Sequence, residues 1–164
     1  MSLDGFIVGP NGESDWIVMD NSFDFESFFH EFDTTLMGRK TFEATRQGGG
    51  PMLPGMQTVV CSTTLQNDDY PDVTVVDDAS NFVTELKAKP GKDIWLFGGG
   101  ELFRSLLDTH HVDTIEIAVM PVLLSQGISL LPSGQRPPAL RLTETNNLSS
   151  GIVGLNYTID YGTK

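Results

Sequence analysis

Two glycine-bearing segments carry the residues of this chain best suited to bind phosphate. Residues 34–43 read TTLMGRKTFE, and residues 93–103 read DIWLFGGGELF. In each, a short apolar run that favours a strand ends in glycine, and an amphipathic stretch that favours a helix begins. A helix start presents backbone N–H groups and the positive end of the helix dipole, and glycine lets an anion approach the backbone closely. Two such starts predict a ligand with more than one phosphate, such as a dinucleotide.

Basic side chains lie close to the first of these segments. In residues 1–86 the only lysines and arginines are Arg39, Lys40 and Arg46, although the whole chain carries a net charge of −12. A positive cluster in an acidic half of the chain is what an anionic ligand requires. The alternative is that the cluster only balances nearby carboxylates such as Glu43.

Composition narrows the class of protein. A chain of 164 residues fits one domain, so we expect a single domain over residues 1–164. The lone cysteine, Cys61, excludes an internal disulfide and a zinc site built from several cysteines, and it fits a reducing cytoplasm. The acidic balance disfavours nucleic acid and anionic membranes as partners, and no apolar run reaches membrane-spanning length. No metal site is expected.

Residues 22–32 predict a helix. Its aromatic residues recur at i, i+3, i+4 and i+7 and form one apolar stripe: Phe25, Phe28, Phe29 and Phe32. Ser22 is placed to cap the start of this helix. An aromatic stripe at this spacing usually packs into a core, so we interpret it as structural.

Helix and strand signals alternate up to residue 107, and strand signals dominate afterwards. Further helices are expected over residues 40–45, over residues 79–86 with Asp78 as the N-cap, and over residues 101–107. Strands are expected over residues 6–8, 36–37, 57–61, 73–76, 94–97, 114–124 (interrupted at Pro121), 140–146 and 153–161. Residues 48–51 are expected to form a loop. This order predicts an α/β fold with a largely parallel sheet. Arg39, Ser62 and Gly98 each follow a strand, so they should meet at the carboxyl edge of that sheet, where ligands bind.

Five motifs, in order along the chain, resemble a known family. They are residues 2–7 (SLDGFI), 15–16 (DW), 37–43 (MGRKTFE), 98–102 (GGGEL) and 121–128 (PVLLSQGI). They resemble the dihydrofolate-reductase-like superfamily and, more narrowly, the C-terminal reductase domain of the bifunctional riboflavin-biosynthesis deaminase–reductase RibD and its stand-alone relatives. The resemblance implies a three-layer α-β-α fold with a mostly parallel central sheet and an antiparallel C-terminal edge strand.

The resemblance implies that the chain binds NADPH, partly through the first glycine segment. Arg39 would face the adenosine 2′-phosphate, while Gly38, Lys40 and Thr41 at the helix start would bind the pyrophosphate. The residue types agree, because the planar guanidinium of arginine matches a phosphate. The alternative is that Arg39 pairs with Glu43 on the same helix face.

Two further groups complete the implied NADPH site. Ser62 and Thr63 would contact the adenosine ribose and its phosphate through short hydroxyl donors, although both could instead only cap a turn. The loop at Leu3 would lie near the nicotinamide. The pyrophosphate would contact the second glycine segment, through Gly98, Gly99, Gly100, Glu101 and Leu102. Alternatively, these glycines only allow a helix to pack closely on a strand.

Two aspartates are candidates for the catalytic role. Hydride transfer often needs a proton donor as well as the cofactor. Asp4 is the first candidate, as an acid or as a hydrogen-bond partner of the substrate; alternatively it stabilises the turn at Gly5. Asp24 is the second, because dihydrofolate reductase carries a carboxylate on its first helix four residues before a phenylalanine, and Asp24 and Phe28 have that spacing.

The chain departs from the family pattern in three places. Family members usually have a full strand before the SLDG motif, where Met1 stands here; either residues precede Met1, or residues 1–8 form an abbreviated strand. Deaminase motifs of the His-x-Glu and Pro-Cys-x-x-Cys type are absent. The Pro-Trp pair of dihydrofolate reductase before its first helix is also absent, which disfavours dihydrofolate reductase itself.

The expected activity is hydride transfer from NADPH to a small heterocyclic substrate, of the type of the 5-amino-6-(5-phosphoribosylamino)uracil reductase of riboflavin biosynthesis. The alternatives are reduction of dihydrofolate or another pteridine, and nucleotide binding without catalysis. A dimer module without any cofactor would leave the basic segment unexplained. The resemblance also implies a homodimer.

Overall fold

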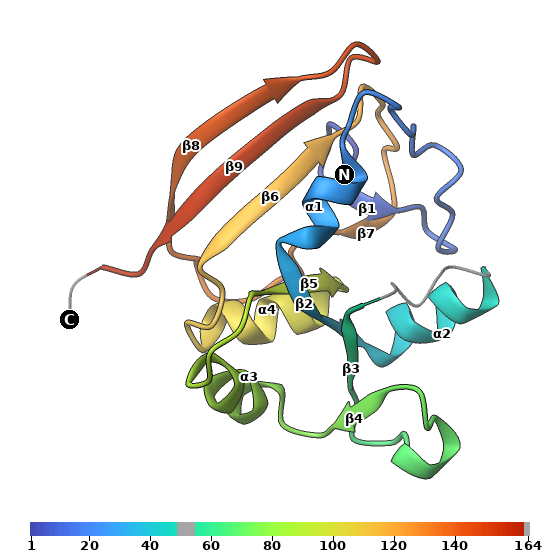
Figure 1. Cartoon of the computed structure of the whole chain (residues 1–164). Coiled ribbons are helices and arrows are strands. Elements are labelled where there is room, and N and C mark those ends of the chain that lie inside the picture. The colour runs from blue at the N-terminus through green and yellow to red at the C-terminus, as the bar shows by residue number, and fades with distance from the viewer. Residues whose placement is uncertain (49–54, 163–164) are drawn as a thin grey trace. The chain divides into compact units, whose positions relative to one another are not determined.

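The computed structural model describes residues 1–48 and 55–162, which fall into two compact units (Figure 1). One unit is residues 25–111, and the other combines residues 1–24 with residues 112–164. A single domain over residues 1–164 stays a prediction. Within the described part of the chain, no helix is long and apolar enough to cross a membrane.

The unit of residues 25–111 is built on a four-stranded parallel sheet in the order β4-β3-β2-β5 (Figure 1). Its strands are β2 (Phe32–Gly38), β3 (Gln57–Cys61), β4 (Thr74–Val76) and β5 (Asp93–Gly98). Its helices are α1 (Phe25–His30), α2 (Arg39–Gln47), the short 3₁₀ helix η1 (Asn67–Asp69), α3 (Ala79–Lys87) and α4 (Gly100–Asp108). The parallel sheet predicted from the sequence is confirmed, and all four strands end at one edge.

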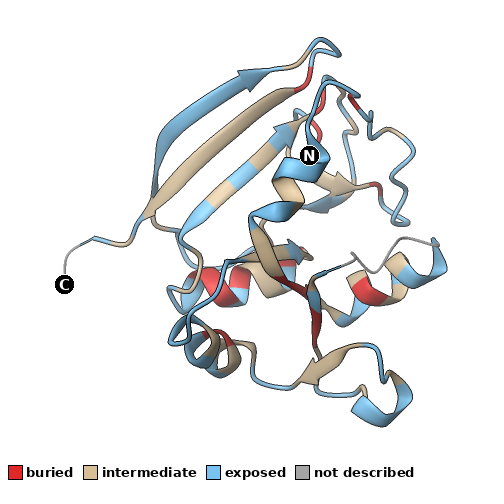
Figure 2. Ribbon diagram, viewed as in Figure 1, coloured by how far each residue is buried: buried red, intermediate tan, exposed pale blue. Residues whose placement is uncertain are grey.

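The core of this unit lies along β2 and β3, which carry the buried stretches seen in Figure 2. Met37, Val60 and Phe42 of α2 form a buried cluster. The Phe42 ring meets Tyr70 edge-on at 5.2 Å, and the Arg46 guanidinium lies over both rings, 5.6 and 5.4 Å from their centroids. Because Tyr70 follows η1, this packing fixes the loop after β3 against α2.

The prediction of a helix over residues 22–32 is wrong at both ends. The helix α1 spans only Phe25–His30, and Phe32 is the first residue of β2, where it pairs with Asp93. Phe28 and Phe32 both contact the Trp95 ring, with centroid distances of 5.4 and 5.9 Å. No residue of α1 is buried and Phe25 is 37% exposed, so the stripe forms a partly buried aromatic cluster and not the core that was expected. Phe32, the last aromatic residue of the stripe, therefore belongs to a strand and still contacts the other aromatic rings.

The predicted cap of that helix is also wrong. The hydroxyl and backbone N–H of Ser22 both donate to the Asp20 carboxylate, at 2.5 and 2.8 Å, in a turn that precedes α1. The carboxylate, which is 8% exposed, captures the serine that would otherwise cap the helix. Gly49 to Pro51, part of the predicted loop, lie outside the described residues.

The second unit contains an antiparallel sheet in the order β6-β9-β8, from β6 (Thr114–Val119), β8 (Ala139–Asn147) and β9 (Val153–Asp160). The antiparallel C-terminal strands are confirmed. The strand predicted over 114–124 ends at Val119, just before Pro121, because proline cannot donate a ladder hydrogen bond. The two-residue strand β7 (Ile128–Ser129), which pairs with β1 (Phe6–Val8), was not predicted.

The first residues of the chain run beside the end of β6. Ser2 forms a parallel bridge with Met120, and the Leu3 N–H donates to the Val122 carbonyl at 2.8 Å. The Met120 N–H donates to the Met1 carbonyl at 2.8 Å. A turn over residues 3–5, closed by the Gly5 N–H donating to the Ser2 carbonyl at 3.1 Å, separates this bridge from β1, so residues 1–8 do not form one continuous strand.

Candidate functional site

The candidate site in the unit of residues 25–111 is the carboxyl edge of the parallel sheet. Gly38 at the end of β2 pairs with Cys61 at the end of β3, and Cys61 pairs with Val76 at the end of β4. The residues that follow, Arg39, Ser62 and Asp77, are therefore neighbours along the edge. The structure thus brings Arg39 and Ser62 together with a carboxylate that the sequence analysis did not include.

The two glycine segments meet at the same edge. Met37 pairs with Gly98 across β2 and β5. A Cβ added at Gly38 would lie 3.9 Å from the Leu102 Cβ, and one added at Gly99 would lie 3.2 Å from the Thr41 Oγ1. The starts of α2 and α4 are thus adjacent, and side chains larger than hydrogen at Gly99 would crowd the gap between them.

Both helices begin without a side-chain cap. Their N-cap residues are Gly38 and Gly99, and neither provides a side-chain hydrogen bond to the first turn. By contrast, the N-cap of α3 is Asp78, as predicted, and its Oδ1 accepts from the Asn81 N–H at 2.9 Å. Glycine N-caps leave the first turn open to an external acceptor, which makes this pair of helix starts suited to a pyrophosphate.

Arg39 is half-exposed at the start of α2. Its Nη1 lies 3.4 Å from the Glu43 Oε1, so the alternative pairing considered from the sequence is present. An exposed pair at this distance contributes little stability, and a phosphate could replace Glu43 as the partner. The exposed Lys40 lies in the same turn.

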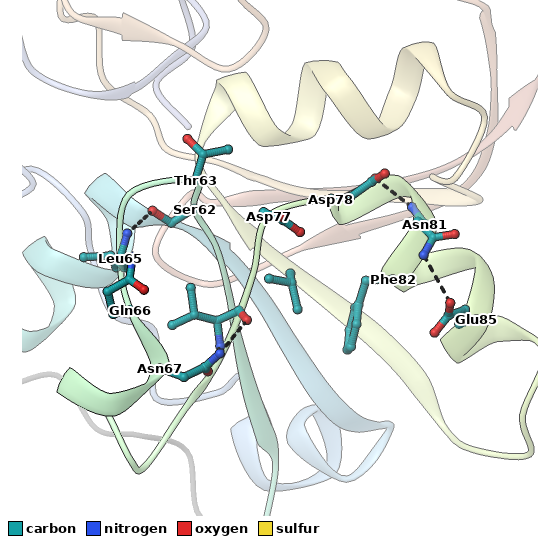
Figure 3. Close-up of a pocket in the computed structure, with 12 residues that line it drawn as sticks. Ser62, Thr63, Leu65, Gln66, Asn67, Asp77, Asp78, Asn81, Phe82 and Glu85 are labelled. Atoms are coloured by element: carbon teal, nitrogen blue, oxygen red, sulfur yellow. Dashed lines mark hydrogen bonds between the residues drawn. The ribbon is translucent and has the colours of Figure 1, made fainter.

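A pocket of about 470 Å³ opens where β3 and β4 end (Figure 3). Its lining includes both hydroxyl residues predicted for the adenosine end, Ser62 and Thr63. The Ser62 Oγ accepts from the Leu65 N–H at 3.1 Å and the Thr64 N–H at 3.2 Å, so Ser62 also stabilises its own turn. The turn-capping alternative thus holds for Ser62, whose side chain still borders the pocket.

The far wall of this pocket is polar and was missed from the sequence. Asp77 and Asp78 follow β4, and Asn81 and Glu85 lie on α3 beside Phe82 (Figure 3). The signal was available, because Asp77 comes directly after a strand, as Ser62 does. The rule that ligands bind beyond the carboxyl ends of strands applies to Asp77 after β4 as it does to Arg39, Ser62 and Gly98.

The other unit holds the loop that was predicted to lie near the nicotinamide. Leu3 is 64% exposed, and the neighbouring Asp4 is exposed as well. The Asp4 carboxylate accepts from the Ser2 hydroxyl and the Ser125 N–H, both at 2.7 Å, and from the Leu124 N–H at 3.2 Å. The hydrogen bond from Ser2, together with those from Ser125 and Leu124, lowers the pKa of Asp4 below its usual value, so the group is ionised at neutral pH.

Asp24, the second catalytic candidate, lies just before α1 and is exposed. The match to dihydrofolate reductase required a carboxylate on the first helix. Asp24 does not meet this requirement, because that helix starts at Phe25.

Burial raises the pKa of Cys61 to about 12, so its thiol stays protonated and unreactive. Among the described residues, no group of three His, Cys, Asp or Glu side chains could hold a metal ion.

Comparisons with known proteins agree with this fold. Residues 1–154 match the family described as RibD C-terminal domain. Two Bacillus subtilis (strain 168) proteins are similar over most of their length: "Uncharacterized protein YyaP", 32% identical over 96% of this chain and 90% of its own, and "Uncharacterized protein YwjB", 30% identical over 93% and 90%.

Solved structures show the same fold. A putative riboflavin biosynthesis protein from Shewanella sp. PV-4 matches with a TM-score of 0.83 and 21% identity, over 98% of this chain and 95% of that chain. A diaminohydroxyphosphoribosylaminopyrimidine deaminase/5-amino-6-(5-phosphoribosylamino)uracil reductase from Thermotoga maritima matches with a TM-score of 0.69 and 17% identity, over 98% of this chain and 54% of that chain.

Proposed function

The chain belongs to the RibD C-terminal domain family, and from this premise we propose that it is an NADPH-dependent reductase. Its substrate would be a small heterocycle of the type reduced by 5-amino-6-(5-phosphoribosylamino)uracil reductase, the activity named for the Thermotoga maritima relative. The observation that carries the proposal is the meeting of two uncapped helix starts, at Gly38 and Gly99, beside Arg39 and Ser62.

The residues at the sheet edge fit a dinucleotide. The first-turn N–H groups of α2 and α4 would hold the pyrophosphate, because both helix dipoles point their positive ends at this edge. An added Cβ at Gly99 would approach Thr41 to 3.2 Å, so glycine keeps this cradle open. Arg39 would bind the 2′-phosphate, and the adenosine ribose would enter the pocket beside Ser62. Bound NADPH would supply the hydride.

Asp4 fits the role of a hydrogen-bond acceptor better than that of a proton donor. Its lowered pKa leaves no proton to give at neutral pH. Three donors from the chain contact the two carboxylate oxygens, and the Leu124 N–H is shared between Oδ1 and Oδ2 at 3.2 Å from each. Together they use about all the acceptor positions that a carboxylate offers. A substrate N–H or O–H would replace one of the two longer contacts from Leu124, while the others hold the loop.

Turnover of NADPH with a matched acceptor tests the proposal. NADPH and NADH are first titrated by cofactor fluorescence, and NADPH oxidation is then followed by absorbance with a ribosylaminopyrimidine and, separately, with dihydrofolate. Oxidation with the pyrimidine supports the proposal. Oxidation only with dihydrofolate would move the substrate to the pteridines, and binding without oxidation by either acceptor would indicate a nucleotide-binding protein without catalysis.

Asp4→Asn tests the substrate role. We expect kcat/KM for the acceptor to fall about tenfold, the value of one hydrogen bond to a charged group, while the NADPH dissociation constant stays unchanged. Glu13→Gln is the matched control, because Glu13 is a loop carboxylate of the same unit whose oxygens accept from Asn11. Equal rates for Asp4→Asn and wild type, with both variants folded by circular dichroism, would leave Asp4 only its turn-stabilising role.

The family resemblance also leads us to expect a homodimer, and the reducing conditions suited to one free thiol favour a cytoplasmic location. Light scattering of the purified protein checks the first expectation.

A further inference from the structure

We propose that Asp77 sets the choice between the two nicotinamide dinucleotides and that this chain uses NADH alongside NADPH. The Asp77 carboxylate would accept a hydrogen bond from a free ribose hydroxyl and repel a phosphate at the same position. This inference rests on the proposed function, because it assigns the pocket between β3 and β4 to the adenosine end of the dinucleotide.

The position of Asp77 follows from strand register. The Ser62 N–H donates to the Val76 carbonyl at 2.8 Å, so Asp77, the residue after Val76, lies next to Ser62 at the start of its turn. Figure 3 shows Asp77 between Ser62 and the first turn of α3. Since β2, β3 and β4 are adjacent, a phosphate bound at Ser62 has Arg39 one strand away on one side and Asp77 one strand away on the other, each about 5 Å along the edge.

Asp77 is the carboxylate of the pocket that is available to a ligand. Asp78 is engaged as the cap of α3, and the Glu85 carboxylate accepts from the Asn81 amide at 3.1 Å. Asp77 is exposed and makes no side-chain hydrogen bond or ion pair with any described residue. No lysine or arginine lines the pocket within the described chain, so nothing there neutralises Asp77.

The chemistry of dinucleotide recognition gives this arrangement its meaning. An acidic side chain commonly accepts the hydrogen bond of the ribose 2′-hydroxyl of NADH, whereas an arginine accommodates the 2′-phosphate of NADPH. Here Arg39 and Asp77 lie on either side of the position at Ser62, and the Arg39 guanidinium also pairs with Glu43. The two effects oppose each other, so the preference for NADPH that Arg39 would give alone is reduced.

The experiment measures dissociation constants of NADPH and NADH for wild type, Asp77→Asn and Asp69→Asn at low ionic strength. We expect wild type to prefer NADPH by less than about tenfold. Asp77→Asn should raise this preference about tenfold, because the 2′-phosphate of NADPH no longer meets a like charge and the ribose hydroxyl of NADH loses its charged acceptor. Asp69→Asn, the same charge change in η1 outside the pocket, should leave the preference unchanged.

A second pair of probes separates this inference from the proposed function. Adenosine 2′,5′-bisphosphate and 5′-AMP lack the nicotinamide, and their affinities should shift with Asp77→Asn in the same directions. Nucleotides that bind under the control of Asp77, with no acceptor oxidising NADPH, would overturn the reductase and keep the inference. NADPH turnover with an unchanged preference in Asp77→Asn, folded by circular dichroism, would overturn the inference alone. Absence of nucleotide binding to wild type would overturn both.

Discussion

Carboxylates satisfy backbone N–H groups in the loops of residues 1–24 and 112–162, whereas glycines begin α2 and α4 at the edge of the parallel sheet. In the first region Asp4 accepts from the N–H groups of Leu124 and Ser125, and Asp20 accepts from those of Ser22 and Ser150. At Gly38 and Gly99 no side chain takes that role.

The difference separates positions that stabilise the fold from positions left for a ligand. A loop whose N–H groups meet an ionised carboxylate is stabilised by charge-assisted hydrogen bonds and gains nothing from an added anion. A helix that begins at glycine keeps its positive end available. The helix α3 starts at the same edge as α2 and α4, but its first turn is already satisfied because Asp78 caps it.

The largest effect is expected when Arg39 is removed from the carboxyl edge of the parallel sheet. Arg39→Ala should weaken NADPH roughly 10- to 150-fold, since a hydrogen bond to a charged group contributes about 1.5–3 kcal/mol, while NADH, which lacks the 2′-phosphate, should change little. Fluorescence titration measures both. Lys89→Ala, which removes one positive charge between α3 and β5, is the control. Equal losses for NADPH and NADH would remove Arg39 from the phosphate site.

A backbone change at the open edge comes next. Gly98 has a backbone φ of 132°, which residues other than glycine rarely adopt, and an added Cβ would meet no atom within 4 Å. Gly98→Ala should therefore lower the free energy of unfolding by about 1–3 kcal/mol through backbone conformation alone. Denaturant unfolding measures this. Gly48→Ala, at an ordinary helical φ of −74°, should stay within about 0.5 kcal/mol of wild type; an equal cost there would contradict the prediction.

Removing the cap of α3 should cost less. Asp78→Ala should lower the free energy of unfolding by about 1 kcal/mol, because the Asn81 N–H loses its acceptor. Asp78→Ser should restore most of that loss, since serine also caps helices. Asp77→Ala, one position earlier, should cost little. A stability of Asp78→Ala equal to that of wild type would show that α3 needs no cap and would weaken the contrast with α2 and α4.

The last prediction is confined to acid pH. Hydrogen bonds from Ser150 and Ser22 hold the pKa of Asp20 far below its ordinary value of 3.8. A lowered pKa in the folded state stabilises the fold above the unfolded pKa, and this contribution is lost as the pH falls below about 4 toward the folded pKa. Wild type should therefore exceed Asp20→Asn in unfolding free energy at neutral pH, and the gap should narrow in acid. A gap that does not depend on pH would contradict this account.

Much of the fold followed from local signals. The predicted strand 57–61 coincides with β3, and the predicted Asp78 cap is present, because an apolar run and a capping residue are encoded by a few adjacent residues. The end of α1 was misplaced because Phe32 satisfies two patterns, a helical stripe and a strand, and only its pairing with Asp93 in β5 decides between them. The strand β7 has two residues, too few for any periodicity.

The candidate site was predicted unevenly. The two glycine segments, which contain Gly38 and Gly99, could be predicted as phosphate-binding because a strand, a glycine and a helix follow one another in the chain. The contact of Gly99 with Thr41 could not be predicted, since it depends on β2 and β5 being neighbours. For Asp4, the sequence offered two roles, and its hydrogen bonds to Leu124 and Ser125 come from residues 120 positions away.

By itself, the sequence determined the types of residue at each strand end and the family to which the chain belongs, because both depend on short, ordered motifs. Tertiary structure decided which of those ends are neighbours. Strand order placed Asp77 beside Ser62 and Ser62 beside Arg39. The sequence already marked Asp78 as the cap of a helix, but only the pairing of β3 with β4 puts Asp77 in the wall of the pocket at Ser62.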